Sequence, residues 1–291
     1  MAHLKLFVLG QPRLERDGRP LELNLRKALA LLVYLAVSGQ LHSRDALATL
    51  LWPESDGREA RARLRRTLHR LNEAIGDHIL DSGSEAIRLQ FHADLWLDCA
   101  EFRQRVSAGL AAAAQDVAAP ERLAHLNAAV ELYTDDFLAG FTLPDSPGFD
   151  EWQFFQRESL RQLYGQMLEQ LVQAYRSQQD WYRAIGYARR WLALDQLHEP
   201  AHRLLMRLYA WAGQQANALR QYQECARVLE AELGAAPEDE TSALYEAIRT
   251  RQLVSPGAVD HQPIAPRVKF RPFEMQRHYP FSKTIAETCR P

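Results

Sequence analysis

The residues whose types and spacing could do chemistry are concentrated in one short segment, residues 58–70. This segment contains six arginines and a single acidic residue, Glu59. Like charges one helical turn apart repel each other, so an exposed helix usually mixes positive and negative side chains. A helix with one sign of charge suits an anionic partner, and the phosphates of double-stranded DNA are the commonest such partner. The alternative interpretation is a solvated helix that is rich in arginine.

The sequence around these arginines predicts the helix that positions them. Pro53 ends the preceding apolar run, because a proline ring cannot continue a helix. Asp56 followed by Glu59 fits a helix N-cap with a capping box. From this point to residue 75, apolar residues recur every three or four positions and predict one buried stripe. The stripe consists of Ala60, Leu64, Leu68, Leu71 and Ile75.

The helical angle divides the basic side chains into two groups. Arg65, Arg66 and His69 lie nearest the face opposite the apolar stripe, so we expect them to approach base edges. The other basic residues flank that face and are better placed for phosphates. These are Arg58, Arg61, Arg63 and Arg70. Outside the helix, Arg88 lies on a predicted strand, where a phosphate contact and a solvated side chain fit the pattern equally well.

Residues 1–98 contain the elements that must hold this helix. The pattern predicts strands over 4–9, 13–25, 78–80, 86–90 and 94–98, and helices over 26–38 and 44–51 before the basic helix. The dipeptide Asp17-Gly18 marks a hairpin turn, Gly39 closes the first helix, and Ser43 caps the second. Strands, three helices and a hairpin in this order describe a winged helix. Its second and third helices form the helix-turn-helix pair.

Residues 99–252 are predicted to be helical throughout. Residues 123–137 have heptad-like apolar spacing, and residues 149–175 form a long amphipathic helix. A repeat follows, because the segment from Ala174 matches the segment from Leu208 at an offset of 34 residues. Ala184 and Ala218 match in this alignment, as do Tyr175 and Tyr209. A 34-residue period is typical of tetratricopeptide repeats, in which small residues lie where two antiparallel helices touch.

The ordered motifs resemble a known family. LATLLWP, HRLNEAIG and the wing make residues 1–98 similar to the OmpR-like winged helix of the antibiotic-regulatory-protein type of bacterial transcriptional activators. LYTDDFLAGF, FDEWQFFQRESLRQLY and the phrase ELG-x-x-P-x-x-E-T at 232–241 make residues 99–252 similar to the bacterial transcriptional activator domain. The resemblance implies an α+β winged helix-turn-helix followed by an all-α tetratricopeptide-like domain. It also implies contact with RNA polymerase and dimer-like binding to repeated promoter sites.

Composition excludes several classes of protein. A length of 291 residues favours two domains, and the net charge of −2 gives no global basic field. The three cysteines lie far apart, which argues against a disulfide framework and a metal knuckle. No apolar run approaches 18 residues and no signal-peptide pattern opens the chain, so we expect a cytoplasmic protein without a membrane span. No phosphate loop or nucleophile elbow occurs, and we expect neither an enzyme nor a cofactor.

One short motif matches the zinc-binding pattern of metalloproteases. Residues 198–202 spell H-E-x-x-H, which binds zinc when both histidines lie on one helical face. Pro200 fits the first turn of a helix, which would leave His198 outside the helix and pointing elsewhere. The repeat register also explains the segment without a metal ion, so we expect no zinc site.

The leading hypothesis is a sequence-specific, DNA-binding transcriptional activator. The alternative is an adaptor, in which the tetratricopeptide-like domain binds peptides and the arginine helix meets an acidic protein surface. Residues 253–291 contain six prolines and no periodic apolar pattern. They are predicted to be a linker or disordered extension, either the end of a short regulator or the remnant of a longer architecture.

Overall fold

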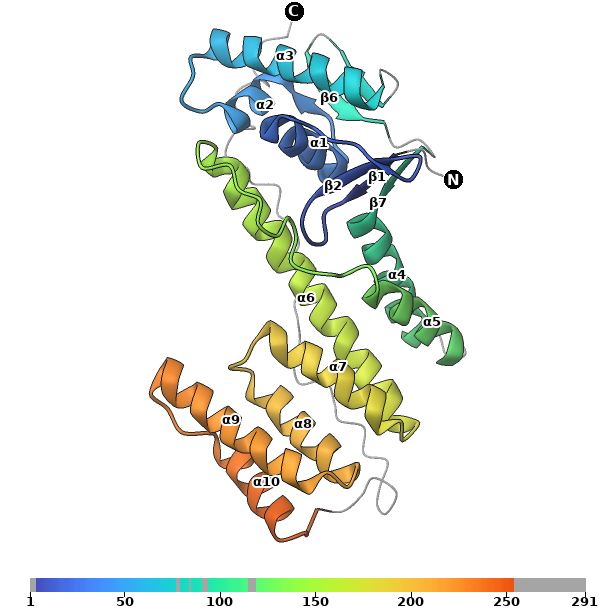
Figure 1. Cartoon of the computed structure of the whole chain (residues 1–291), viewed down its shortest axis with the longest axis vertical. Helices are drawn as coiled ribbons and strands as arrows, with labels where there is room; N and C mark the ends of the chain where they lie inside the picture. Colours follow the sequence, from blue (N-terminus) through green and yellow to red (C-terminus); the bar gives the residue numbers. More distant parts are fainter. Residues whose placement is uncertain (1–3, 77–78, 84, 91–93, 115–118, 254–291) are drawn as a thin grey trace, which may run out of the picture. The chain divides into compact units, whose positions relative to one another are not determined.

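The computed structural model describes residues 4–76, 79–83, 85–90, 94–114 and 119–253 (Figure 1). These residues belong to one compact unit that extends to Leu253. The predicted linker or tail lies outside the described residues from position 254 onward. None of the described helices is long and apolar enough to cross a membrane.

The first part of the chain alternates strands and helices. Its elements are β1 (Leu4–Phe7), β2 (Arg13–Arg16), β3 (Arg19–Pro20), α1 (Arg26–Ser38), β4 (His42–Ser43), α2 (Arg44–Leu51), α3 (Gly57–Ile75), β5 (Leu80–Ser82), β6 (Ala86–Leu89) and β7 (Leu95–Leu97). The described remainder is helical. Its elements are α4 (Asp98–Ala114), α5 (Ala119–Val130), α6 (Pro147–Ser177), α7 (Trp181–Leu194), α8 (Glu199–Trp211), α9 (Gln215–Leu233) and α10 (Asp239–Arg249).

The local signals at the first two helices are confirmed. Gly39 follows α1 with a φ of 60°, a left-handed conformation that suits glycine, and its N–H bonds to the carbonyl of Leu35. The Ser43 hydroxyl accepts a bond from the N–H of Ala46 and so caps α2. The hairpin turn also lies where it was predicted, because Asp17 and Gly18 both have positive φ between β2 and β3.

The strands form two sheets, whose pairing the sequence does not specify beyond the two hairpins. The first sheet has the order β3-β2-β1-β7, and the second has the order β4-β6-β5. The strand expected over 94–98 is β7, and it pairs in parallel with β1, with Leu4 opposite Leu95. The strand expected over 78–80 is β5 and begins at Leu80, while residues 77–78 lie outside the described residues. Such short strands contain little local information about their partners, which tertiary packing selects.

The apolar spacing over 123–137 does not form one helix. Helix α5 ends at Val130, and Phe137 lies in the irregular segment that follows. Phe137 is buried and forms isolated bridges with Leu9 and Gly10, just beyond β1. The heptad-like spacing therefore included the apolar face of α5 and, beyond its end, Phe137. Phe137 is buried next to Leu9 and Gly10 and does not belong to that face.

The 34-residue repeat is confirmed in the geometry of its turns. The carbonyl of Tyr175 accepts a bond from Asp180 N at 2.9 Å, and the matching carbonyl of Tyr209 accepts one from Gln214 N at 2.8 Å. Ala184 in α7 and Ala218 in α9 are both fully buried. The end of α6 with α7, and α8 with α9, are thus equivalent helix pairs, and α10 packs against the second pair.

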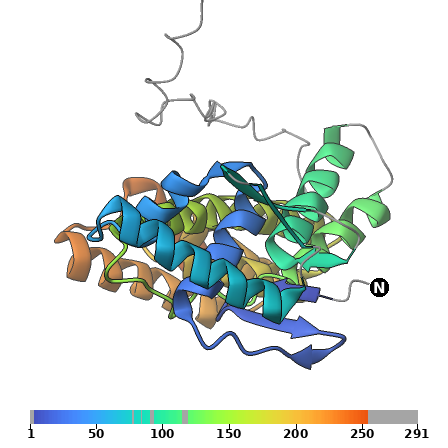
Figure 2. The ribbon, with the colours of Figure 1, turned by 90° about the horizontal axis from the view of Figure 1, so that it is seen from above.

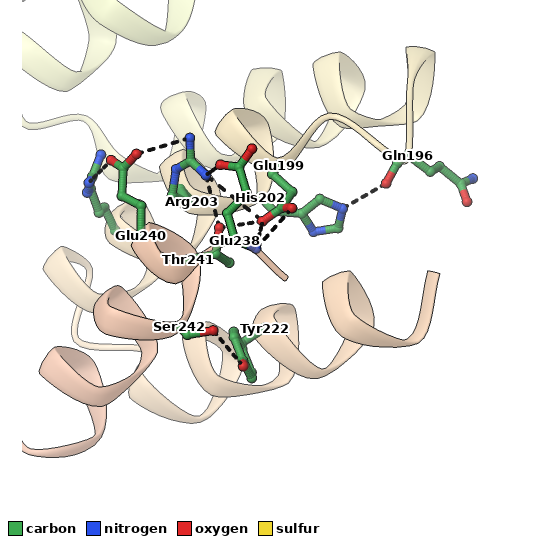
Figure 3. A network of polar contacts seen from close by, with 10 residues as sticks. Gln196, Glu199, His202, Arg203, Tyr222, Glu238, Glu240, Thr241 and Ser242 are labelled. Carbon is green, nitrogen blue, oxygen red and sulfur yellow. Dashed lines mark hydrogen bonds and ion pairs between the residues drawn. The ribbon is translucent and has the colours of Figure 1, made fainter. Parts of the chain in front are cut away.

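A polar network joins α8 to the start of α10 (Figure 3). The Glu199 carboxylate accepts bonds from the backbone N–H of Glu238 at 3.0 Å and from the Thr241 hydroxyl at 2.6 Å. Arg203 donates to Glu238 at 2.7 Å and to Thr241 at 3.0 Å, and it lies 3.4 Å from Glu240. Glu238, Glu240 and Thr241 belong to the segment ELG-x-x-P-x-x-E-T. The polar residues of this segment therefore have a structural role, because they connect α8 to the start of α10.

The H-E-x-x-H segment lies at the start of α8, with His198 at the N-cap as predicted. The ring of His198 packs against Trp191 with centroids 5.2 Å apart. His202 is buried, and its Nε2 donates to the carbonyl of Gln196 while its Nδ1 accepts from the Gln221 amide. Each ring therefore has a structural partner, and the described residues contain no cluster of three side chains suited to a metal ion.

Candidate nucleic-acid interface

Helix α3 begins and packs largely as its sequence predicts. Asp56 Oδ1 accepts a bond from Glu59 N at 2.7 Å, which confirms the N-cap. The second half of the predicted capping box is wrong, because the Glu59 carboxylate accepts from Arg63 at 2.6 Å instead of bonding back to Asp56. Arg63 follows Glu59 by one helical turn, the spacing at which an acidic and a basic side chain meet on a helix surface.

The predicted apolar stripe is buried against α1 and α2. Ala60, Leu64, Leu68, Leu71 and Ile75 are each 5% exposed or less, and Thr67 extends the stripe. Figure 2 shows α3 running across the winged helix, and no described helix or strand covers its outer face. The face that carries the basic side chains is therefore open to a partner.

Half of the eight predicted base-facing and phosphate-facing side chains are exposed without an acidic partner among the described residues. Within the described part of the chain, no ion pair is found for Arg58, Arg65, Arg66 or Arg70. His69 is also exposed, and its Nε2 lies 3.4 Å from the Glu73 carboxylate. These arginines give α3 a concentrated positive charge that its own acidic residues do not neutralise.

Three of the predicted DNA-contacting arginines pair with acidic residues on the same surface. Arg61 donates to Asp45 of α2 at 2.7 Å, and this hydrogen bond raises the pKa of Arg61. Arg63 pairs with Glu59, and Arg88 pairs with Asp81 at 2.9 Å across the β5–β6 ladder. Exposed ion pairs of this kind contribute little to stability, so a phosphate could displace the acidic partner at small cost.

The wing is attached to the helix-turn-helix by contacts that sequence reasoning missed. Arg44, the first residue of α2, donates its Nε–H to the carbonyl of Gly83 at 3.1 Å and its backbone N–H to that of Glu85 at 2.9 Å. The preceding residues 42–43 form β4 and pair with β6. The two residues His42 and Ser43 are too few to signal a strand, so nothing local indicated that α2 is bonded to the wing.

Sequence reasoning also missed Arg26 and Lys27 at the start of α1. Positive side chains in the first turn of a helix oppose the helix dipole, and this turn contains no acidic residue. That unfavourable placement was a usable signal of a nearby anion. In the structure the anion is Asp145, whose Oδ2 accepts from Lys27 Nζ at 2.7 Å.

A buried carboxylate connects the sheet of β1 to the helical part of the chain. Asp98, the first residue of α4, is 2% exposed. Its Oδ2 accepts the N–H groups of Val8 at 2.8 Å and Leu9 at 2.9 Å, and its Oδ1 accepts that of Cys99. Burial raises the pKa of Asp98 to about 6, although the three N–H groups and Arg13 act in the opposite direction.

Comparison with known proteins identifies the second half of this architecture. Residues 97–249 match the family model of the bacterial transcriptional activator domain, which is more than half of the chain. The chain belongs to the bacterial transcriptional activator domain family. The resemblance inferred from the motifs is thereby confirmed.

Two individual proteins place this family assignment in context. The regulatory protein AfsR of Streptomyces coelicolor is 28% identical over 250 residues, which cover 84% of this chain and 24% of AfsR. The chain thus spans about a quarter of that relative's length. A structure of Mycobacterium tuberculosis EmbR in complex with a low-affinity phosphopeptide superposes with a TM-score of 0.67 at 23% identity, covering 88% of this chain and 67% of that one. This likeness confirms the predicted fold class, a winged helix followed by a tetratricopeptide-like helical domain.

Proposed function

We propose that this protein is a sequence-specific, DNA-binding transcriptional regulator that activates transcription. The observation that carries the proposal is the open outer face of α3, on which Arg58, Arg65, Arg66 and Arg70 have no acidic partner in the described part of the chain. The structure adds the winged-helix setting of that helix, in which the recognition helix of other proteins enters the major groove. Membership of the activator-domain family and the similarity to a regulatory protein support the regulatory role.

The proposal assigns two roles within α3 and its surroundings. Arg65, Arg66 and His69 approach base edges, where a bidentate arginine contact contributes about 1–3 kcal/mol of discrimination. The remaining basic residues hold phosphates on either side of the groove. These are Arg58, Arg61, Arg63 and Arg70 in α3, and Arg88 in the wing. Three of this second group exchange a carboxylate partner for a phosphate when DNA binds.

The helical domain, residues 99–252 in this proposal, contacts the transcription machinery. RNA polymerase is the partner implied by the family, and self-association on repeated sites is the second implication. Residues 1–98 form the DNA-binding domain.

The decisive experiment compares two neighbouring arginines of α3. An operator is first selected from genomic fragments, and affinities for it and for unrelated DNA are then measured at two salt concentrations. Arg66→Ala is expected to reduce discrimination between the two DNAs. Arg70→Ala is expected to weaken both about equally and to lower the salt slope by about 1.

Two results would change the proposal in different ways. Equal losses of affinity in both variants would leave DNA binding intact and remove the assignment of Arg66 to a base edge. If wild-type protein selects no DNA even at low salt, the proposal fails. The α3 arginines would then have to serve an acidic protein surface, as the adaptor hypothesis requires.

A further inference from the structure

A groove about 450 Å³ in volume lies between the start of α1, one flank of α3 and residues 142–145. Five basic side chains line it, and Asp145 is its one acidic side chain among the described residues. The basic residues are Arg26 and Lys27 of α1 and Arg63, Arg66 and Arg70 of α3. We refer to it below as the arginine groove.

The charges of the arginine groove are poorly balanced. Arg63 pairs with Glu59 and Lys27 pairs with Asp145, whereas Arg66 and Arg70 have no ion-pair partner in the described part of the chain. Arg26 donates to the carbonyl of Thr142 at 2.8 Å, which satisfies a donor without neutralising its charge. A concave site with several uncompensated guanidinium groups has the chemistry of an anion site, because arginine binds phosphate oxygens in a planar, two-bond arrangement.

The start of α1 adds a second, independent feature. Its N-cap residue, Leu25, has no side chain that can accept a hydrogen bond, and the first turn contains no acidic residue. The first N–H groups of a helix have no partner within the helix and favour an anion. Leu25, Arg26 and Lys27 all line the arginine groove, so this positive helix end borders the space that the α3 arginines flank.

Asp145 shows how Lys27 binds an anionic group at the edge of the arginine groove. Its carboxylate bonds to Lys27 Nζ, and this hydrogen bond with Lys27 lowers the pKa of Asp145, as does the nearby charge of Arg63. The Lys27 ammonium also donates to the carbonyl of Leu51 and lies 5.1 Å from the centre of the Trp52 ring, so its position is fixed from three sides. Asp145 itself is largely exposed and can move away from the ammonium.

We propose that the arginine groove binds a phosphate group, for which Asp145 substitutes in the free protein. Phosphate is the shared chemistry of two sources, a backbone phosphate of DNA and a free phosphorylated compound. The DNA source rests on the proposed function, and the second source does not. In either case Arg26 and Lys27 act from outside the recognition helix, and the incoming phosphate competes with Asp145 for Lys27.

Inorganic pyrophosphate is the probe, titrated calorimetrically into the full chain at constant ionic strength. Saturable binding to the wild type is expected. Asp145→Asn removes the competing carboxylate and is expected to tighten binding by about twofold to fivefold, the range for one exposed ion pair. Lys27→Gln keeps a donor for Leu51 but removes the charge, and is expected to weaken binding at least as much.

Arg19→Gln is the matched control, because it removes the same charge at an exposed residue of β3 that does not line the groove and has no assigned role in binding. Its pyrophosphate affinity is expected to equal that of the wild type. No saturable binding would overturn the proposal, and so would an equal loss in Arg19→Gln and Lys27→Gln. Thermal unfolding establishes that each variant is folded. If Lys27→Gln does not fold, Asp145→Asn still tests the proposal, because Asp145 is exposed and its substitution is not expected to disturb folding.

A competition experiment then separates the two sources. If pyrophosphate displaces a DNA duplex more strongly than sodium chloride of equal ionic strength does, the groove holds a DNA phosphate. If the two bind together, the groove serves a free phosphorylated compound. A wild type that binds pyrophosphate but no DNA would refute the proposed function alone. A wild type that binds DNA but shows no saturable pyrophosphate binding would refute the groove alone.

Discussion

The buried carboxylate of Asp98 makes the stability of this protein depend on pH in an unusual direction. In the unfolded chain its pKa is near 3.8, whereas burial raises the pKa to about 6 in the folded protein. The folded state therefore binds the proton more tightly. The contribution of protonated Asp98 to the free energy of unfolding is fully present below about pH 4 and is lost as the pH rises towards 6 and above.

The size of this effect follows from the change in pKa. A shift of about two units corresponds to about 3 kcal/mol between the protonated and ionised states. Because other carboxylates also titrate in this range, the measurable quantity is the difference between the wild type and Asp98→Asn. The asparagine approximates the neutral form and does not titrate. Between pH 4 and pH 7, the wild type is expected to lose up to about 3 kcal/mol of unfolding free energy relative to Asp98→Asn.

Urea unfolding, followed by circular dichroism at half-unit steps of pH, measures this difference. The result that refutes the reasoning is a wild type that gains stability relative to Asp98→Asn as the pH rises. In that case the three N–H groups that bond to Asp98 outweigh its burial, and the carboxylate is ionised in the folded protein throughout.

Three further substitutions test the packing. Leu68→Ala in α3 is expected to cost about 2–5 kcal/mol in urea unfolding, and an unchanged midpoint would mean that the apolar stripe is not the buried face. Ala218→Leu is expected to overpack the α8–α9 contact and to lower the free energy of unfolding by about 1–3 kcal/mol. Ala216→Leu, at an exposed position of α9, is expected to leave stability unchanged. Equal stability of the two variants would contradict the repeat register. Arg203→Met removes the positive charge beside the buried Glu199 carboxylate, which keeps its hydrogen bonds from Glu238 and Thr241, and is expected to cost about 3–5 kcal/mol. Arg227→Met, at an exposed pair, is expected to leave the melting temperature unchanged.

The sequence predicted those elements whose signals are local. The Asp56 cap, the Gly39 stop and the 3.6-residue stripe of α3 each depend on neighbouring residues, and each was confirmed. The 34-residue repeat was equally accessible, because Tyr175 and Ala184 recur as Tyr209 and Ala218 at that offset, and the matching turns confirm it.

The features that were missed all depend on contacts between distant positions. Strand β7 could not be assigned to β1 from the sequence, because three residues do not specify a partner about 90 positions away. The arginine groove needs Asp145 beside Lys27, a separation of 118 residues. For the residues proposed to contact DNA, the sequence predicted the helical face on which they lie. Which arginines are already paired with carboxylates depends on α2 and the wing, and so on the folded arrangement of side chains.

The connection between the two halves of the chain has a consequence for where an activator could work on a promoter. Strand β7 ends at Leu97 and α4 begins at Asp98, so no loop separates them, and Asp98 fastens this point to the segment after β1. A winged helix bound to DNA would therefore hold the activator domain at a fixed rotational phase around the double helix. Moving the operator by half a helical turn, about 5 base pairs, would turn that domain to the opposite side of the DNA, and a full turn of about 10.5 base pairs would restore it. A flexibly tethered activator would tolerate both displacements alike.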